Sequence, residues 1–165
     1  MLALPTHKQQ TLRISSSSPM ALPQPFSVTV HPFTSPARTH GYLCAYERGN
    51  ALSRNAIVYI GGLTSGPHTA LDISQTLLSA LNDAKLGYSI WECRMRSSYS
   101  GWGYSSLKDD VEDVAPFVEY LRDLGKSRVV LLGSSTGKLT CIQRVSQIQS
   151  SFWTSQHLTL STHDF

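Results

Sequence analysis

The chain has 165 residues, a length typical of a single domain. Its 14 Lys and Arg against 11 Asp and Glu leave a formal net charge of only +3, which argues against a nucleic-acid partner. Charged residues make up 15% and hydrophobic residues 41%, so a buried core is expected rather than disorder throughout. Three widely spaced cysteines form neither a disulfide framework nor a metal-binding pair, and no apolar stretch is long enough for a membrane span. We expect a reduced, cytoplasmic setting, with no metal or cofactor.

Residues 1–25 are expected to form a disordered extension before the folded domain. They contain a four-serine run and several prolines, and no acidic residue appears before Glu47. Met20 is an alternative start to Met1. The absence of acids is faintly similar to a mitochondrial presequence, so mitochondria are the alternative localisation.

The ordered pattern begins with three predicted strands. Residues 26–30 alternate apolar and polar side chains, which predicts a half-buried strand. Residues 41–46 form a second strand candidate that ends at a turn signal, and we expect the two to pair as a hairpin. Residues 56–60 are continuously apolar and stop at two glycines, which is typical of a strand buried on both faces of a parallel sheet.

Helices and strands then alternate. The periodic patterns predict, in chain order, a helix that has Pro67 in its first turn and is closed by Gly87, a strand over 88–93, a helix over 107–124 and a strand over 128–132. A β-hairpin followed by β-α-β-α-β indicates an α/β fold with a doubly wound parallel sheet.

The helix predicted over 107–124 carries three local signals. Ser106 and Asp109 have the spacing of a capping box. Pro116 is expected to kink the helix or split it in two. The acidic residues in the first turns are interpreted as a solvated face favoured by the helix dipole; they are Asp109, Asp110, Glu112 and Asp113.

The most informative motif is Gly133-Ser134-Ser135-Thr136-Gly137, which directly follows the last predicted strand. This is G-x-S-x-G in the required context, a strand before it and a helix after it. The flanking glycines let neighbouring backbone pass without a Cβ clash, and the tight turn lifts the central hydroxyl clear of the sheet. Ser135 is therefore the predicted nucleophile, and the N–H of Thr136 a predicted oxyanion donor.

A second oxyanion donor is expected from the loop after the strand over 56–60, where Gly61-Gly62-Leu63 lie. The N–H of Leu63 is the predicted donor. The alternative to the elbow is a chance Ser-Gly turn in a serine-rich chain. A phosphate-binding loop is disfavoured, because only three residues separate the two elbow glycines and Leu139 stands where a Mg²⁺-binding Ser or Thr is needed.

These motifs resemble a known family. From Ile57 to Gly137 the sequence resembles the α/β-hydrolase superfamily. More narrowly, within that superfamily it is similar to a fungal group of unassigned hydrolases (DUF1749 or UPF0613), which includes the siderophore esterase acting on fusarinine C. The residues that carry this resemblance are 58–64, the loop over 97–103 with residues 106–110 and Glu112, and 132–137.

The resemblance implies ester or peptide-like bond hydrolysis without a cofactor, on a small-molecule ester. By resemblance, Ser135 matches the nucleophile, and Thr136 and Leu63 match the oxyanion donors. The family usually has His before the nucleophile, where this chain has Ser134.

The acid and the base of a triad are not evident after Ser135. In this fold they follow the nucleophile in the order acid, then histidine, on later loops. The remaining residues hold only Asp164, His157 and His163, in the wrong order and too close together. We therefore expect a partial α/β-hydrolase domain over 26–140 that ends just after the elbow, with an unpaired sheet edge and marginal stability.

Residues 141–165 are expected to be an atypical Ser/Thr/Gln-rich tail with no strand in its second half. Gly137-Lys138-Leu139 can be encoded by codons that contain a splice-donor consensus, so our hypothesis is that the tail is translated intron sequence. Two functions stay open. One is a serine esterase whose triad is incomplete in this chain and which is inactive as written. The other is a non-catalytic hydrolase fold with at most a binding role.

Overall fold

The computed structural model describes residues 25–35, 41–66, 71–150 and 158–162. The strands are β1 (Thr29–Thr34), β2 (Tyr42–Gly49), β3 (Asn55–Ile60), β4 (Tyr88–Cys93), β5 (Arg128–Gly133) and β6 (Leu158–Thr162). The helices are α1 (Leu71–Asp83), the 3₁₀ helix η1 (Tyr99–Tyr104), α2 (Leu107–Asp123) and α3 (Thr136–Ser150). The predicted extension over 1–25 lies almost entirely outside the described residues.

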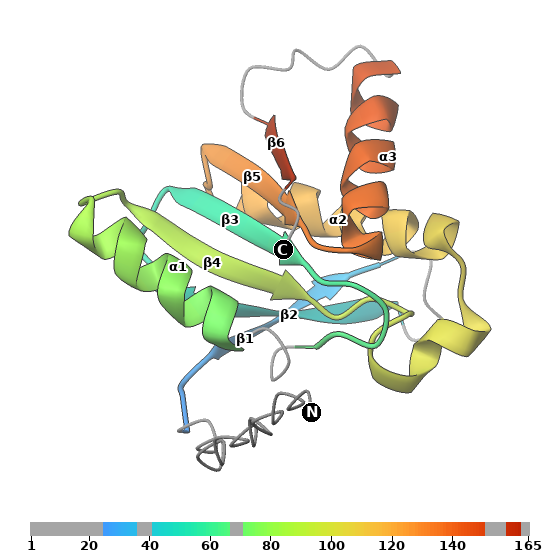
Figure 1. Cartoon of the computed structure of the whole chain (residues 1–165). Helices are drawn as coiled ribbons and strands as arrows, with labels where there is room; N and C mark the ends of the chain where they lie inside the picture. Colours follow the sequence, from blue (N-terminus) through green and yellow to red (C-terminus); the bar gives the residue numbers. More distant parts are fainter. Residues whose placement is uncertain (1–24, 36–40, 67–70, 151–157, 163–165) are drawn as a thin grey trace, which may run out of the picture.

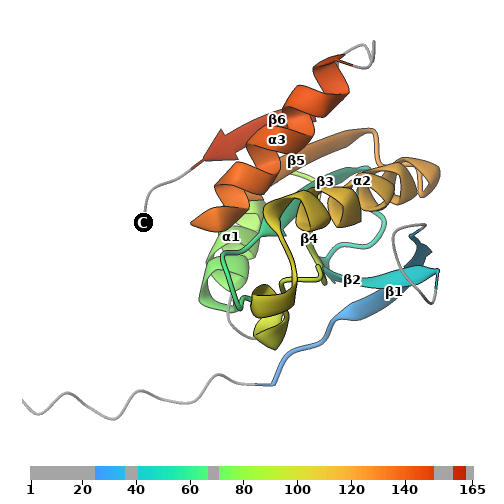
Figure 2. The same ribbon diagram turned by 90° about the vertical axis from the view of Figure 1, so that its right-hand side faces the viewer.

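The strands form one mixed sheet in the order β1-β2-β4-β3-β5-β6. The pairs β1–β2 and β2–β4 are antiparallel, and β4–β3, β3–β5 and β5–β6 are parallel. Helix α1 covers one face, while α2 and α3 cover the other (Figure 1, Figure 2). The predicted hairpin and the β-α-β-α-β order are confirmed.

The two faces of the sheet bury separate apolar clusters. On the α1 face, Leu81 packs with Ile57 and Ile90. The larger cluster lies under α2 and α3 and includes Trp91, which is completely buried, and Phe117. Strands β3 and β4 contribute to both clusters, which explains their continuously apolar sequences.

The expected end of the sheet at β5 is wrong, and so is the expected split of a helix at Pro116. The sheet does not end at β5, because Leu158–Thr162 pairs in parallel with it as β6. Helix α2 is not split at Pro116 but runs unbroken from Leu107 to Asp123. The buried residues on either side of the proline, Val114 and Phe117, bind the helix to the sheet and outweigh the single hydrogen bond that proline removes.

The helix ends follow local rules. The capping box at the start of α2 is confirmed, since the Ser106 side chain accepts from the Asp109 N–H and Asp109 accepts from the Ser106 N–H. Gly125, with φ of 80°, takes the chain out of α2. Within the described ranges, no helix combines the length and apolar character needed to cross a membrane.

Candidate functional site

Ser135 lies at the tip of the β5–α3 turn, which we call the elbow (residues 133–137). Its φ is 52°, a left-handed conformation that a serine rarely adopts and that costs on the order of 1 kcal/mol or more. The turn is closed by the Gly137 N–H donating to the Ser134 carbonyl at 2.9 Å, and by the Lys138 N–H donating to the Ser135 carbonyl at 3.0 Å. Ser135 is exposed, so a strained backbone presents it to solvent.

The two elbow glycines stand where backbone segments nearly touch. A Cβ at Gly137 would lie 2.1 Å from the Ile60 carbonyl oxygen. A Cβ at Gly133 would lie 2.7 Å from the Gly137 carbonyl oxygen and from the Lys138 backbone. The role predicted for these glycines, allowing close backbone passage, matches the geometry.

The loop after β3, which we call the glycine loop (residues 61–66), reaches the elbow. A Cβ at Gly62 would lie 2.9 Å from Ser135 Cβ and 3.3 Å from its Oγ. The Ser134 N–H donates to the Ile60 carbonyl at 3.0 Å, which fixes the elbow against the end of β3. Gly61 and Gly62 thus lie beside the predicted nucleophile.

Two N–H groups beside the elbow have no partner among the described residues: those of Leu63 and Thr136. Leu63 lies in a tight turn closed by the Ser65 N–H, which donates to the Gly62 carbonyl at 3.2 Å. Thr136 is the first residue of α3, where the helix leaves its N–H groups without internal acceptors and the dipole favours negative charge. They are the two N–H groups for which the sequence predicts a role as oxyanion donors, and that role stays a prediction. The structure brings all seven predicted site residues to one edge of the sheet.

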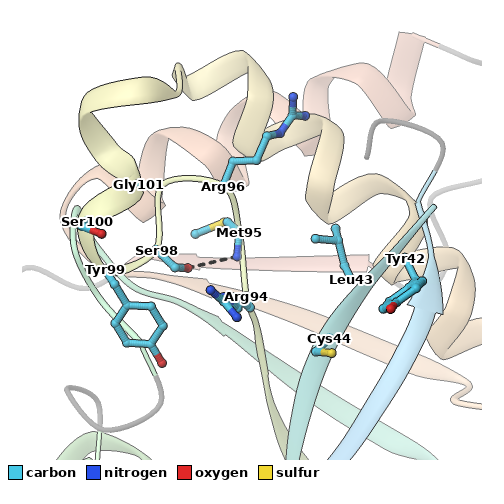
Figure 3. A pocket seen from close by; sticks show the side chains of 10 residues that line it. All are labelled: Tyr42, Leu43, Cys44, Arg94, Met95, Arg96, Ser98, Tyr99, Ser100 and Gly101. Atoms are coloured by element: carbon cyan, nitrogen blue, oxygen red, sulfur yellow. Dashed lines mark hydrogen bonds between the residues drawn. The ribbon is translucent and has the colours of Figure 1, made fainter. Parts of the chain in front are cut away.

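The loop after β4 borders a cavity of about 540 Å³ (Figure 3). Its lining residues are Tyr42, Leu43, Cys44, Arg94, Met95, Arg96, Ser98, Tyr99, Ser100 and Gly101. Ser135 does not line this cavity. The two are linked by the glycine loop, because a Cβ at Gly66 would lie 2.2 Å from the Tyr99 ring.

Arg96 anchors the loop after β4, which we call the β4 loop (residues 94–98), to the start of α2. Its backbone N–H donates to Asp113 Oδ2 at 2.7 Å and its Nε to Asp113 Oδ1 at 3.1 Å. Its Nη atoms reach Asp109 at 2.8 Å and Glu112 at 3.0 Å. Burial alone would lower the pKa of Arg96, but the hydrogen bonds that it donates to these acids and the Asp113 charge raise it.

The expectation of a solvated acidic face on α2 is wrong for two of its four acids. Asp113 is completely buried and Asp110 is buried, where it accepts from the Ser97 N–H at 3.2 Å. Asp109 and Glu112 stay partly exposed, with side-chain exposures of 31% and 43%, while they accept from Arg96. Arg96, in the loop after β4, is the signal in the sequence that was missed.

A buried carboxyl group also lies near the glycine loop. Glu92 lines a small cavity together with Gly61 and accepts from the Ser74 hydroxyl at 3.1 Å. Burial raises its pKa, although Arg48, whose Nη2 lies 3.3 Å from Oε1, acts in the opposite direction. Glu92 ties α1 to the sheet beside the glycine loop.

The described residues do not place a histidine near Ser135. They contain only His31, which contacts Glu47 and Tyr120 at 3.2 and 3.1 Å on β1. Four strand spacings separate β1 from β5, or about 19 Å. His157, His163 and Asp164 lie outside the described residues.

Two other chemistries find little support in the described part of the chain. Burial raises the pKa of Cys141 to about 12, so this thiol is a poor nucleophile at neutral pH. No group of three or more His, Cys, Asp or Glu among the residues described is placed to hold a metal ion.

Comparison with solved structures places this geometry in a known fold. A bacterial brefeldin A esterase superimposes with a TM-score of 0.59 at 18% identity, covering 81% of this chain and 39% of the esterase. At that identity the likeness concerns the fold alone. The chain thus has an α/β fold that matches part of the α/β-hydrolase fold.

Sequence relatives narrow the assignment. A UPF0613 protein of Schizosaccharomyces pombe is 34% identical over 101 residues, covering 58% of this chain and 31% of the relative. The fusarinine C esterase of Aspergillus fumigatus is 25% identical over 126 residues, covering 68% and 35%. The chain thus spans about a third of the length of these curated relatives. The family described as "Protein of unknown function (DUF1749)" matches residues 17–155, a range that includes the elbow and α3. The chain therefore belongs to the DUF1749 family, within the α/β-hydrolase superfamily.

Proposed function

We propose that this chain carries the nucleophile and the oxyanion-binding loop of a serine esterase that acts on small-molecule esters. The observation that carries the proposal is the backbone of Ser135, held at φ of 52° between a parallel strand and a helix. Strain of this kind persists only where the surroundings fix it, and here backbone contacts of both flanking glycines do so. It is the arrangement that presents a serine hydroxyl to a substrate carbonyl.

In the proposed reaction, the Ser135 hydroxyl attacks the ester carbonyl carbon and gives its proton to a general base. The alcohol leaves as the acyl-serine bond forms, and water then hydrolyses that bond to release the acid. The N–H groups of Leu63 and Thr136 donate to the oxyanion of each tetrahedral intermediate. Loss of one such donor typically costs about 3 kcal/mol of transition-state stabilisation.

The relatives support an ester rather than another carbonyl substrate. Two of the curated relatives carry the name esterase, and one of them acts on fusarinine C. We extend this to siderophore-type esters as the proposed substrate class. Because the matched segment spans only about a third of the relatives' length, the activity of the whole protein is part of the proposal.

The general base lies outside the described residues, since His31 is four strands away from β5. We therefore expect the 165-residue chain to react only weakly with a fluorophosphonate, which needs a deprotonated serine. Added imidazole replaces a missing base in solution, so it is expected to increase the labelling.

The test is mass-spectrometric mapping of fluorophosphonate labelling with and without imidazole. Ser135→Ala is expected to abolish the labelling, while Ser134→Ala, which removes the adjacent hydroxyl, is expected to leave it unchanged. Absence of imidazole-dependent modification at Ser135, or equal modification of both serines, would favour the alternative of a non-catalytic hydrolase fold. The lack of a described histidine near Ser135 is the observation that keeps this alternative in view.

A further inference from the structure

The cavity beside the β4 loop has one positive charge that its surroundings do not balance. Arg94 and Arg96 line it, and no acidic residue does. Arg96 is paired with the acids at the start of α2. Arg94 is exposed and has no carboxylate partner among the residues that the structure describes. The cavity therefore presents a single available guanidinium.

Hydrogen-bonding groups surround this guanidinium. Arg94 lies 5.8 Å from the centre of the Tyr99 ring, and it is placed between that ring and the start of β2, which carries Cys44 (Figure 3). Burial raises the pKa of the nearby Tyr46 phenol, the Tyr99 phenol raises it further, and the Arg94 charge acts against both. Tyr99 and Ser98 also line the cavity, so an anion bound there can accept a hydrogen bond from a hydroxyl as well as from the guanidinium.

Arg94 and the elbow follow two strands that end at the same edge of the sheet. Arg94 follows β4 and Ser135 follows β5, and β3 lies between these two parallel strands. Two strand spacings place the ends of β4 and β5 about 10 Å apart at the same edge of the sheet. A small second cavity extends from the large one toward the glycine loop, because it shares Met95 and Ser98 with the large one and is also lined by Gly61.

We propose that Arg94 is a specificity-determining residue that binds a carboxylate of the ester substrate, at the same edge of the sheet as the elbow that carries Ser135. The inference rests on the proposed esterase function and adds the substrate class, an ester that also carries a free carboxylate. A guanidinium matches a carboxylate in shape and in charge, one positive for one negative. A phosphate monoester carries up to two negative charges and would leave one unbalanced.

The test measures equilibrium binding of two probes to the full 165-residue chain by NMR titration. Monomethyl suberate carries an ester at one end and a carboxylate at the other, whereas dimethyl suberate has the same chain without the charge. The wild-type protein is expected to bind the monoester at least about tenfold more tightly, because hydrogen bonds to a charged group are the strong ones. Increasing salt is expected to reduce this preference.

Three variants make the test specific. Arg94→Gln is expected to bind both probes equally, and Arg94→Lys to retain part of the preference. Arg54→Gln is the matched control, because Arg54 precedes β3 at the opposite edge of the sheet and its loss changes the net charge equally. Equal binding of the two probes by wild type, or a preference that survives in Arg94→Gln, would overturn the proposal.

The outcome is separable from that of the esterase proposal. Binding of the suberate esters does not require a reactive serine, so Ser135→Ala is expected to keep the preference for the monoester. A preserved preference together with absent labelling of Ser135 would refute the esterase and leave the carboxylate site. Labelling of Ser135 without any preference would refute the carboxylate site alone.

Discussion

Replacing Gly137 by alanine sets a favourable and an unfavourable effect against each other, and the structure says which is larger. Alanine in place of glycine in a helix normally gains up to about 1 kcal/mol. At this position, however, the new Cβ would lie 2.1 Å from the Ile60 carbonyl oxygen and 2.6 Å from that of Gly61. A normal carbon–oxygen contact is about 3.4 Å, so α3 and β3 would have to separate by about 1 Å.

Both opposing atoms are backbone carbonyl oxygens, one at the end of β3 and one at the start of the glycine loop, so neither can rotate away as a side chain would. Overpacking of this kind costs about 1–3 kcal/mol, and we expect the upper part of that range. After the helix-propensity gain is subtracted, Gly137→Ala is predicted to lose about 2 kcal/mol of unfolding free energy. The melting temperature would then fall by about 4–8 °C.

The assay is urea unfolding followed by tryptophan fluorescence, with Gly87→Ala as the matched control. A Cβ at Gly87 would meet nothing within 4 Å, so this variant is expected to be neutral or slightly stabilised. Imidazole-dependent labelling of Ser135 is expected to fall on the order of 100-fold in Gly137→Ala, since a displacement of about 1 Å is large for catalytic geometry. Equal unfolding free energies for the two variants would refute the steric reasoning.

Three further outcomes are expected. Asp113→Ala should lose about 3 kcal/mol in urea unfolding, because it leaves the Arg96 N–H and guanidinium without their buried partner; a loss below about 0.5 kcal/mol would mean that the remaining acids suffice. Iodoacetamide should alkylate the half-buried Cys44 of the native protein well before Cys141, whose pKa is raised to about 12 by burial, and equal rates would contradict this. Hydrogen bonds from the N-cap serine lower the pKa of Asp109 below 3.8, so its contribution to stability exists above that value and is lost as the pH falls through the lowered pKa. The stability difference between wild type and Asp109→Asn should therefore shrink on acidification, and a constant difference would argue against the cap.

The order of the elements was predictable because each one has a strong local pattern. The apolar runs over 56–60 and 128–132 correspond to β3 and β5, whose burial on both faces excludes polar side chains. The first strand was placed too early, since β1 begins at Thr29 rather than at Phe26. It lies at the edge of the sheet with mostly exposed side chains, so burial imposes no strict alternation on its sequence.

Strand β6 has only a weak signal in its own residues. Leu158–Thr162 alternates apolar and polar side chains, but over only five residues that follow a Ser/Gln-rich segment, and this short alternation was missed. It becomes a strand because the free edge of β5 offers a row of unpaired N–H and carbonyl groups. A tertiary partner, rather than local propensity, determines this element.

The candidate site was predictable to the extent that it consists of backbone. Gly62, Ser135 and Gly137 act through close approach and a positive φ, and such demands leave glycines at fixed spacings in the sequence. The role of Arg96 depends instead on a helix that follows more than ten residues later, and acids with helical spacing look the same whether they face water or a loop. Side-chain anchoring over such separations carries no local pattern.

This difference divides the site into two parts that respond differently to amino-acid substitution. The elbow and the glycine loop are held by backbone hydrogen bonds and by the absence of side chains, so substitution there changes the position of Ser135 itself. The β4 loop is held by Arg96 through side chains of α2, so Arg94, which lies two residues earlier and has no carboxylate partner among the described residues, can change without moving the elbow. Preference for one ester over another can therefore be altered at position 94 while the attacking group stays in place. Binding measurements on Arg94 variants and labelling of Ser135 report on these two parts independently.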